Sequence, residues 1–313
     1  MMRNCVKLCH MLDICLLGTG GTQPLTNRWL TSLLVRYQGH SVLIDCGEGT
    51  QIAVQKTGLT LKPVDKILIT HLHADHISGL PGLLLTMGNM GRTEPVSIIG
   101  PVGTERVVYA LRSIAQHLPF DVRISEIETP TEVMHFLDCD ITAFAVNHGM
   151  PCYGYSFYLP RSGKFDPARA KELNIPLPYW SKLQKGAVIE HEGTTYTPDM
   201  VLGPARRGLK LTYCTDSRPT ESIRRAAADA DLFICEGMYG EADMLPKALE
   251  NRHMLFTEAA QLAADAGGVK ELWLTHYSPS LPNPKDFRAA ARAIFPNTET
   301  PRDGWCKTLS FAD

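Results

Sequence analysis

The sequence predicts an α/β layered domain, and two observations support this. Short runs of apolar and β-branched residues alternate with helical segments from residue 12 onward, as in sheets that are covered by helices. His, Asp or Glu follows several of these predicted strands directly. Both halves of the chain end with such strands, which suggests a pair of similar sheets.

Composition limits the protein class. The 313 residues are 44% hydrophobic, which is enough for one large domain or two modest ones. A net charge of −2 excludes a uniformly basic nucleic-acid binder but leaves room for a local basic patch. No apolar run reaches the roughly 20 residues that span a bilayer, so no membrane association is expected. Asp13 interrupts the only leader-like stretch, which argues against a signal peptide.

The nine cysteines are odd in number and scattered, and no Cys-x-x-Cys occurs. This usage favours free thiols in a reducing, cytoplasmic compartment. Residues 1–10 are interpreted as an N-terminal extension, since Met11 could be the biological start. A single domain is expected over residues 11–313.

The first predicted elements are a strand over 12–17 and a glycine-rich turn over 18–21. This turn is a poor match to a dinucleotide-binding loop, because its third glycine is missing and Pro24 stands where the helix should begin. A tight loop that brings the backbone close to a site is the better interpretation.

A hairpin is predicted next, with strands over 31–37 and 41–45, and a helix follows over 51–56. Asp45 lies directly after the second strand, at the kind of sheet edge where α/β sites form. It could orient a metal-bound imidazole or simply cap a turn, and both interpretations stay open.

A strand ending at Thr70 is followed by His71, His73, Asp75 and His76. Alternation places the first two imidazoles on one side of an extended segment. A bend at Ala74 could bring the other two side chains to the same pocket. Such a density of imidazole and carboxylate favours zinc or a similar divalent ion over an exposed polar turn.

The same pattern recurs later in the chain. Strands are predicted over 96–99, 141–146, 209–214, 232–235 and 272–274. Helices are predicted over 103–117, 221–228, 257–266 (capped by Thr257) and 284–294. Three of the later strands are followed by His148, Asp216 and His276, and a fourth by Glu236. Strand ends hold ligands rigidly.

An interruption separates the strands that precede His148 and Asp216. Residues 161–210 carry nine Lys or Arg and five Asp or Glu, a local positive excess. Asp166 can cap a short helix that begins at Pro167. A basic arm with the neighbouring residues Tyr179, Trp180, Lys182 and Lys185 suits a polyanion with stackable bases. An ordinary surface excursion or a dimer contact remains the alternative.

Seven candidate ligands are too many for one tetrahedral ion and fit two ions ~3.5–4 Å apart. His71, His73 and His148 would hold one ion, and Asp75, His76 and His276 the other. Asp216, with two oxygens, would bridge them. No cysteine takes part, so a hydrolytic centre is the simpler hypothesis. His253 is the best spare histidine for a proton donor, although a surface histidine before a helix is the plainer interpretation.

This ligand set resembles that of the metallo-β-lactamase superfamily, and further motifs resemble its ribonuclease Z family, zinc endonucleases that mature the 3′ end of transfer RNA. The resemblance covers nearly the whole chain from Leu12. The segments that carry it are Leu17-Gly18-Thr19-Gly20, Asp45-Cys46-Gly47-Glu48-Gly49-Thr50-Gln51, Lys164-Phe165-Asp166, Leu173-Asn174-Ile175-Pro176, Leu183-Gln184-Lys185-Gly186 and Val201-Leu202-Gly203-Pro204.

The resemblance implies a four-layer αβ/βα sandwich with an inserted substrate-binding arm over 161–203. It implies two Zn²⁺ ions, with Mn²⁺ or another divalent ion as a substitute, and precursor tRNA as substrate. It also implies a homodimer in which one subunit's arm grips RNA while the other subunit cuts. Asp75 would act as proton acceptor, and His253 would assist as acid.

The chain departs from the family pattern at three places: Leu177-Pro178-Tyr179-Trp180 in the arm, Thr215-Asp216-Ser217, and His253-Met254-Leu255. Two alternatives therefore stay open. One is a metal-dependent hydrolase of small phosphodiesters or another small substrate. The other is a non-catalytic RNA-binding protein that retains a relic site.

Overall fold

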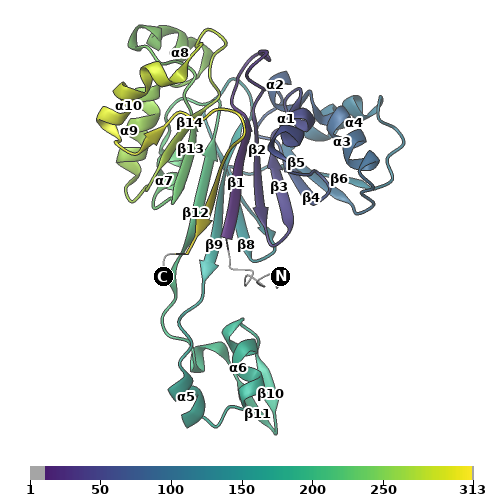
Figure 1. The fold of residues 1–313 in the computed structure, drawn as a ribbon, viewed down its shortest axis with the longest axis vertical. Coiled ribbons are helices and arrows are strands. Elements are labelled where there is room, and N and C mark those ends of the chain that lie inside the picture. Colours follow the sequence, from purple (N-terminus) through teal and green to yellow (C-terminus); the bar gives the residue numbers. More distant parts are fainter. Residues whose placement is uncertain (1–10, 312–313) are drawn as a thin grey trace, which may run out of the picture.

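Two β-sheets face each other at the centre of the structure, a computed structural model that describes residues 11–311 (Figure 1). Each sheet has seven strands within this range. In pairing order the first contains β16 (Trp305–Ser310), β1 (Met11–Gly18), β2 (Ser32–Tyr37), β3 (His40–Ile44), β4 (Val64–Leu68), β5 (Val96–Pro101) and β6 (Val122–Ile127). The second contains β15 (Thr298–Glu299), β14 (Leu272–Thr275), β13 (Leu232–Glu236), β12 (Arg206–Cys214), β9 (Tyr153–Arg161), β8 (Cys139–Ala145) and β7 (Thr131–Phe136).

Helices cover the outer face of each sheet. The first sheet packs against α1 (Thr50–Thr57), α3 (Leu80–Asn89) and α4 (Thr104–Arg112), and the second against α7 (Glu221–Ala227), α9 (Phe256–Ala266) and α10 (Arg288–Ile294). Two short helices, α2 (Ala74–Ile77) and α8 (Leu245–Asn251), and the 3₁₀ turns Ala242–Met244 and Pro284–Phe287 lie in connecting segments. The four-layer αβ/βα sandwich is therefore confirmed (Figure 1).

The central core lies between the two sheets and draws side chains from both. Leu33 and Ile44 come from the first sheet, and Tyr155, Leu211 and Trp273 from the second. All five are almost fully buried. Both sheets combine antiparallel strands with a parallel set, β3 to β6 in one and β12 to β15 in the other. This arrangement matches the expected pair of similar sheets, whose parallel strands end at loops on one edge.

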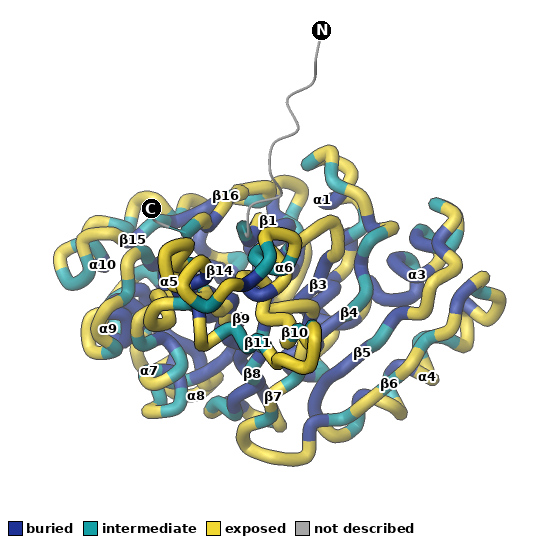
Figure 2. Tube along the Cα trace, turned by 90° about the horizontal axis from the view of Figure 1, so that it is seen from below, coloured by how far each residue is buried: buried dark blue, intermediate teal, exposed yellow. Residues whose placement is uncertain are grey.

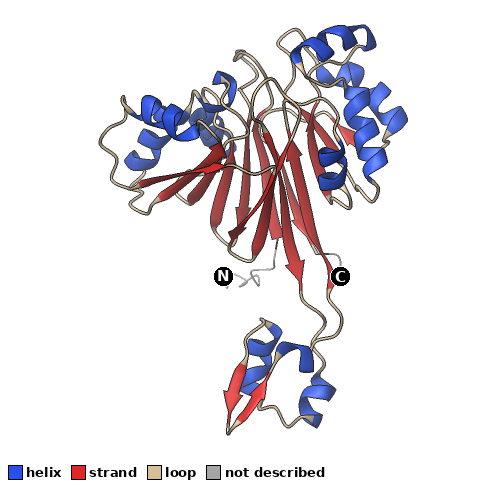
Figure 3. Ribbon diagram, turned by 180° about the vertical axis from the view of Figure 1, so that it is seen from behind, coloured by secondary structure: helices blue, strands red, loops and turns tan. Residues whose placement is uncertain are grey.

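A separate arm leaves the body between β9 and β12 (Figures 1 and 3). It contains α5 (Pro167–Glu172), α6 (Leu177–Gln184), β10 (Ile189–His191), β11 (Thr194–Tyr196) and the 3₁₀ turn Pro198–Met200. The side chain of Asp166 accepts hydrogen bonds from the backbone N–H groups of Ala168 and Arg169, which confirms the predicted cap. The arm has a small hydrophobic cluster of its own, and most of its other residues are exposed (Figure 2).

Several boundaries differ from the sequence prediction. Seven strands were not predicted: β6, β7, β9, β10, β11, β15 and β16. The helix expected over 103–117 ends at Arg112, where the Ser113 hydroxyl takes the Ala110 carbonyl that the next helical turn would use. Thr257 does not cap α9. The helix starts one residue earlier, and the Leu255 N–H donates to the Glu258 carboxylate 2.9 Å away.

The expectation that all cysteines are free thiols is wrong for one pair. Register places Cys15 of β1 directly opposite Cys306 of β16, with the Cα atoms 4.1 Å apart, and the two form a disulfide. The other described cysteines are free and buried: Cys46, Cys139, Cys152, Cys214 and Cys235. Cys5 and Cys9 belong to the predicted 1–10 extension, which lies outside the described residues.

Within residues 11–311, no helix combines the length and the apolar character that crossing a bilayer requires.

Candidate metal centre

Seven side chains from four distant parts of the chain meet at one edge of the two sheets. They follow β4, β8, β12 and β14. Two groups without a shared member have ligand atoms within 4.8 Å of one another: His71, His73, His148 and Asp216, and Asp75, His76 and His276. A third group, Asp216, His253 and His276, overlaps both. All the residues predicted as metal ligands are therefore brought together.

The first group is a cluster of three imidazoles. His71 Nε2 lies 2.9 Å from His73 Nδ1, and His148 Nε2 lies 3.2 Å from that same His73 atom. The rings of His73 and His148 meet edge to face. His71 is fully buried, whereas His73 is exposed. The cluster is thus buried at His71 and open to solvent at His73.

The second group combines two imidazoles with a carboxylate. His76 Nε2 lies 3.2 Å from His276 Nε2. Asp75 Oδ2 is 3.4 Å from the His276 atom and 3.6 Å from the His76 atom. The chain bends at Ala74, as predicted, because α2 begins there, and this bend brings His76 to the second group.

Asp216 lies between the two groups and presents one oxygen to each. Its Oδ1 is 3.2 Å from Nε2 of both His76 and His276. Its Oδ2 is 3.7 Å from His71 Nε2 and 4.0 Å from His148 Nε2. This is the geometry that a bridging carboxylate needs.

Asp45 supports the second group from behind. Its carboxylate lies 2.8 Å from His76 Nδ1 and accepts hydrogen bonds from the N–H and hydroxyl of Thr70. Burial lowers the pKa of His76, but the charges of Asp216 and Asp45 outweigh it, so that the pKa is raised well above its usual value. With Nδ1 committed to Asp45, Nε2 is the atom that faces the other ligands.

The backbone at the site is strained in the same way at three strand ends. Asp45, Asp216 and His276 have φ values of 58°, 47° and 57°, in the left-handed region that non-glycine residues rarely adopt. Such strain is concentrated at functional sites because it aims particular side chains.

The glycine-rich turn after β1 approaches the site closely, as predicted. A Cβ on Gly21 would lie 2.6–2.9 Å from ring atoms of His276, so only glycine fits there. The next residue, Thr22, donates its N–H to Asp75 Oδ2 at 2.6 Å. The turn therefore packs against one proposed ligand and orients another.

His253 stands beside the cluster, between α8 and α9. Its ring stacks on His276 with centroids 5.5 Å apart, and its Nδ1 lies 3.1 Å from Glu236 Oε2. Burial lowers its pKa, but the charge and hydrogen bond of Glu236 and the charge of Asp216 outweigh burial and raise the pKa to about 9. The side chains around His253 therefore favour its protonated form.

Glu236 was not among the predicted site residues, although it was noted as the acid at the end of a strand. It is fully buried and accepts hydrogen bonds from the backbone N–H groups of Ser217 and Met254. These bonds fix the carboxylate against His253. Its position at the end of β13, next to the strand that precedes Asp216, was the available indication.

The donor set fits divalent metal ions. His76 Nε2 and Asp216 Oδ1 face each other at 3.2 Å, and the Asp216 atom is buried without a hydrogen-bond partner among the described residues. With Nδ1 bonded to Asp45, the Nε2 atom that faces the Asp216 oxygen holds either a proton, which the raised pKa of His76 favours without metal, or a metal ion in its place. Imidazole and carboxylate together suit zinc or a similar ion.

The predicted substrate-binding residues lie in the arm, at the other end of β9 and β12 (Figure 3). Trp180 donates from Nε1 to the Ile175 carbonyl and packs on Phe165. The Tyr179 hydroxyl bonds with His191, and Lys182 lies over the Tyr179 ring. Lys185 is exposed. The two aromatic side chains thus serve the packing of the arm, whereas the two lysines reach solvent.

Comparison with known proteins gives high sequence identity over nearly the full chain. The ribonuclease Z of Lachnospira eligens is 56% identical over 303 residues, which cover 97% of this chain and 99% of that protein. The ribonuclease Z of Lachnoclostridium phytofermentans is 55% identical over 301 residues, covering 96% and 99%. A family model described as anti-Pycsar protein Apyc1 matches residues 12–113.

Solved structures share the fold. The short form of human tRNase Z superimposes with a TM-score of 0.68 at 23% identity, covering 94% of this chain and 98% of that one. The metallo-β-lactamase fold protein YhfI from Bacillus subtilis superimposes with a TM-score of 0.69 at 18% identity, covering 96% and 100%.

Proposed function

The chain belongs to the ribonuclease Z family of the metallo-β-lactamase fold, and on that premise we propose that it is a metal-dependent endoribonuclease that removes the 3′ trailer from precursor tRNA. The observation that carries the proposal is the bridged double cluster of histidines and aspartates. We propose two Zn²⁺ ions for it, replaceable by Mn²⁺ or another divalent ion. His71, His73 and His148 would hold one, Asp75, His76 and His276 the other, and Asp216 both.

Two bound ions would supply Lewis acidity and a water of lowered pKa next to the scissile phosphate. The remaining work falls to side chains of this chain. Asp75, held by the Thr22 N–H, would accept the proton of the attacking water. Asp45 would keep His76 in one tautomer and one orientation.

His253 is proposed as the acid that protonates the leaving oxygen. Its Nδ1 is bound to Glu236, so that Nε2 is free to donate. The raised pKa of His253 favours its protonated form, which is the state that an acid requires. Glu236 is then a positioning residue that acts through His253.

The arm, residues 161–203, is proposed to bind RNA in a homodimer. The nine residues of β12, at about 3.4 Å each, place the base of the arm roughly 30 Å from the strand end that precedes Asp216. An arm this far from its own metal centre suits a substrate cut by the partner subunit. We also propose a cytoplasmic location.

Incubation with a trailer-bearing tRNA transcript tests the proposal. The expected result is one cut after the discriminator base, abolished by a chelator and restored by Zn²⁺ or Mn²⁺. Mass spectrometry of the intact holoenzyme should give two metal ions per chain. Metal-dependent hydrolysis of a chromogenic bis-aryl phosphate without any cut in the transcript would contradict the RNA substrate while leaving the metal centre intact.

A further inference from the structure

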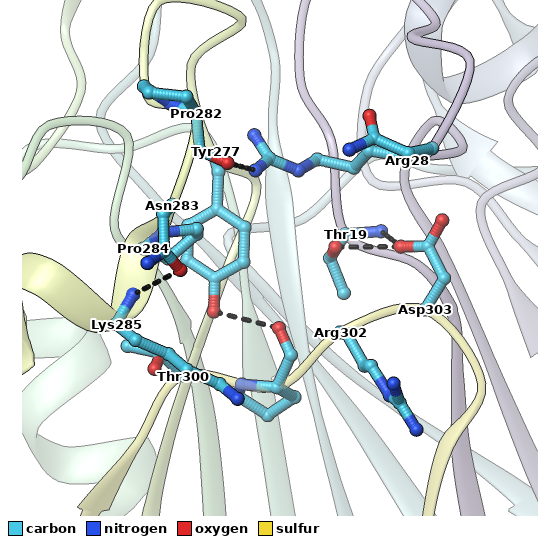
Figure 4. Close-up of a pocket in the computed structure, with 12 residues that line it drawn as sticks. Thr19, Arg28, Tyr277, Pro282, Asn283, Pro284, Lys285, Thr300, Arg302 and Asp303 are labelled. Carbon is cyan, nitrogen blue, oxygen red and sulfur yellow. Dashed lines mark hydrogen bonds between the residues drawn. The ribbon is translucent and has the colours of Figure 1, made fainter.

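A cavity of about 270 Å³ lies beside the segment that follows β14 (Figure 4). The neighbour of His276 in the chain, Tyr277, forms one wall, and the loop 282–285 and the segment 300–303 form others. Tyr277 exchanges backbone hydrogen bonds with Thr19 and Gly21. The cavity therefore shares one strip of backbone with the metal centre.

The charges around this cavity are unbalanced. Arg28, Lys285 and Arg302 line it against a single carboxylate, Asp303. Both oxygens of Asp303 are already engaged, one by the N–H and hydroxyl of Thr19 and the other by the Trp29 N–H. The lining thus keeps an excess of positive charge that internal pairs do not neutralise.

One of the three cationic side chains, that of Arg28, is bonded within the protein and forms part of the cavity wall. Arg28 is buried and donates to the carbonyls of Ser278 and Pro282 while lying over the Tyr277 ring. The side chains of Lys285 and Arg302 are exposed and form no hydrogen bond or ion pair within residues 11–311. Figure 4 shows them on opposite sides of Tyr277. Two free cations flanking a small cavity favour an anionic ligand, and phosphate above all.

The rest of the lining favours a ligand that is larger than a phosphate ion. Three prolines, Pro282, Pro284 and Pro301, supply flat apolar walls. The exposed amide of Asn27 also lines the cavity and makes no side-chain hydrogen bond within the described part of the chain. Such an amide can bond to a base edge. The volume of about 270 Å³ is just below the roughly 300–1,000 Å³ of small-molecule sites, which limits the ligand to about one nucleotide.

We propose that this cavity binds one nucleotide, with its phosphate between Lys285 and Arg302 and its base against the prolines and Asn27. The nucleotide comes either from the free pool or from an RNA strand at the metal centre. Only the second source rests on the proposed function. Because the cavity and the metal centre share the segment 276–277, a bound nucleotide would also stabilise the backbone that carries His276.

Calorimetry with uridine 5′-monophosphate and with inorganic phosphate, on the metal-loaded full-length protein, tests the proposal. Arg302→Glu and Lys285→Glu should each weaken uridine monophosphate binding about tenfold or more. Arg106→Glu, an exposed change on α4, is the matched control and should leave it unchanged. Equal affinity in all four proteins would overturn the proposal, since phosphate would then be held at the metal centre alone.

A crystal soaked in 5-bromouridine 5′-monophosphate locates the ligand directly. A bromine anomalous peak beside Tyr277 and the prolines is expected, and a peak only at the histidine cluster would overturn the site. Cleavage kinetics separate the two sources. If the nucleotide belongs to the RNA, Arg302→Glu raises KM for the transcript more than for a bis-aryl phosphate. If it is free, KM for both substrates changes equally, although binding of uridine monophosphate is still lost.

Discussion

Asp75 has two proposed roles, because it would hold a metal ion and would also accept the proton of the attacking water. Its Oδ2 accepts the Thr22 N–H and lies 3.4 Å from His276 Nε2. Asp75→Asn keeps the shape but removes the charge, so we expect kcat for transcript cleavage to fall by about 10²–10⁴-fold. Single-turnover cleavage measures this. Metal content and thermal midpoint serve as controls, and a wild-type rate would rule out Asp75 as proton acceptor.

The pair of His253 and Glu236 predicts a pH dependence. Burial lowers the pKa of His253, but the charge and hydrogen bond of Glu236 together with the charge of Asp216 outweigh burial and raise the pKa to about 9. An acid with this pKa is protonated below pH 9, so the cleavage rate should fall as pH rises through about 9. Glu236→Gln removes the charge that raises the pKa, and the alkaline limb should move to lower pH. His253→Ala should lower kcat and abolish that limb.

A pH–rate profile of kcat for each variant checks this pair. Glu236 is fully buried, so the thermal midpoint of Glu236→Gln must be followed alongside. A structural role alone would lower activity equally at every pH. An unmoved alkaline limb in a folded Glu236→Gln protein would therefore remove Glu236 from the mechanism.

The proposed RNA binding by the arm is tested by changing two of its lysines. Lys182 lies on α6 and Lys185 directly follows it, and each can neutralise one RNA phosphate. The double change Lys182→Ala/Lys185→Ala should weaken tRNA binding and reduce the salt slope of log K by about 1 per lysine. Arg106→Ala on α4 is the control. Filter binding at several salt concentrations measures the slope, and an unchanged slope would remove these lysines from the RNA contact.

At the scale of the whole molecule, one covalent link joins the first and last strands. The disulfide between Cys15 and Cys306 spans 291 positions of sequence. Cross-links over long loops contribute about 2–4 kcal/mol to the free energy of unfolding. Cys306→Ser, or reduction of the native protein, should therefore lower the thermal midpoint by several degrees.

Thermal melts with and without a thiol reductant measure the effect. A midpoint that reductant does not change would mean that the two cysteines are thiols in the purified protein. A reducing cytoplasm also favours the thiol form. The difference between the two melts therefore measures how much the disulfide stabilises the protein once it has formed.

The sequence alone determined the residue types of the metal centre and their attachment to strand ends. His71 to His76 lie within six positions, and His148, Asp216 and His276 each follow an apolar run. Local patterns of this kind are written in a short stretch of chain. The Asp166 cap and the close approach of the glycine-rich turn were predictable for the same reason.

Only the tertiary structure decided which distant groups meet. Strand register pairs Cys15 with Cys306, and the packing of β13 against the loop before α9 sets Glu236 on His253. The arm aromatics pack inward, and a cavity opens between loops from three parts of the chain. No local pattern encodes these contacts, because each depends on how segments far apart in sequence are folded against one another.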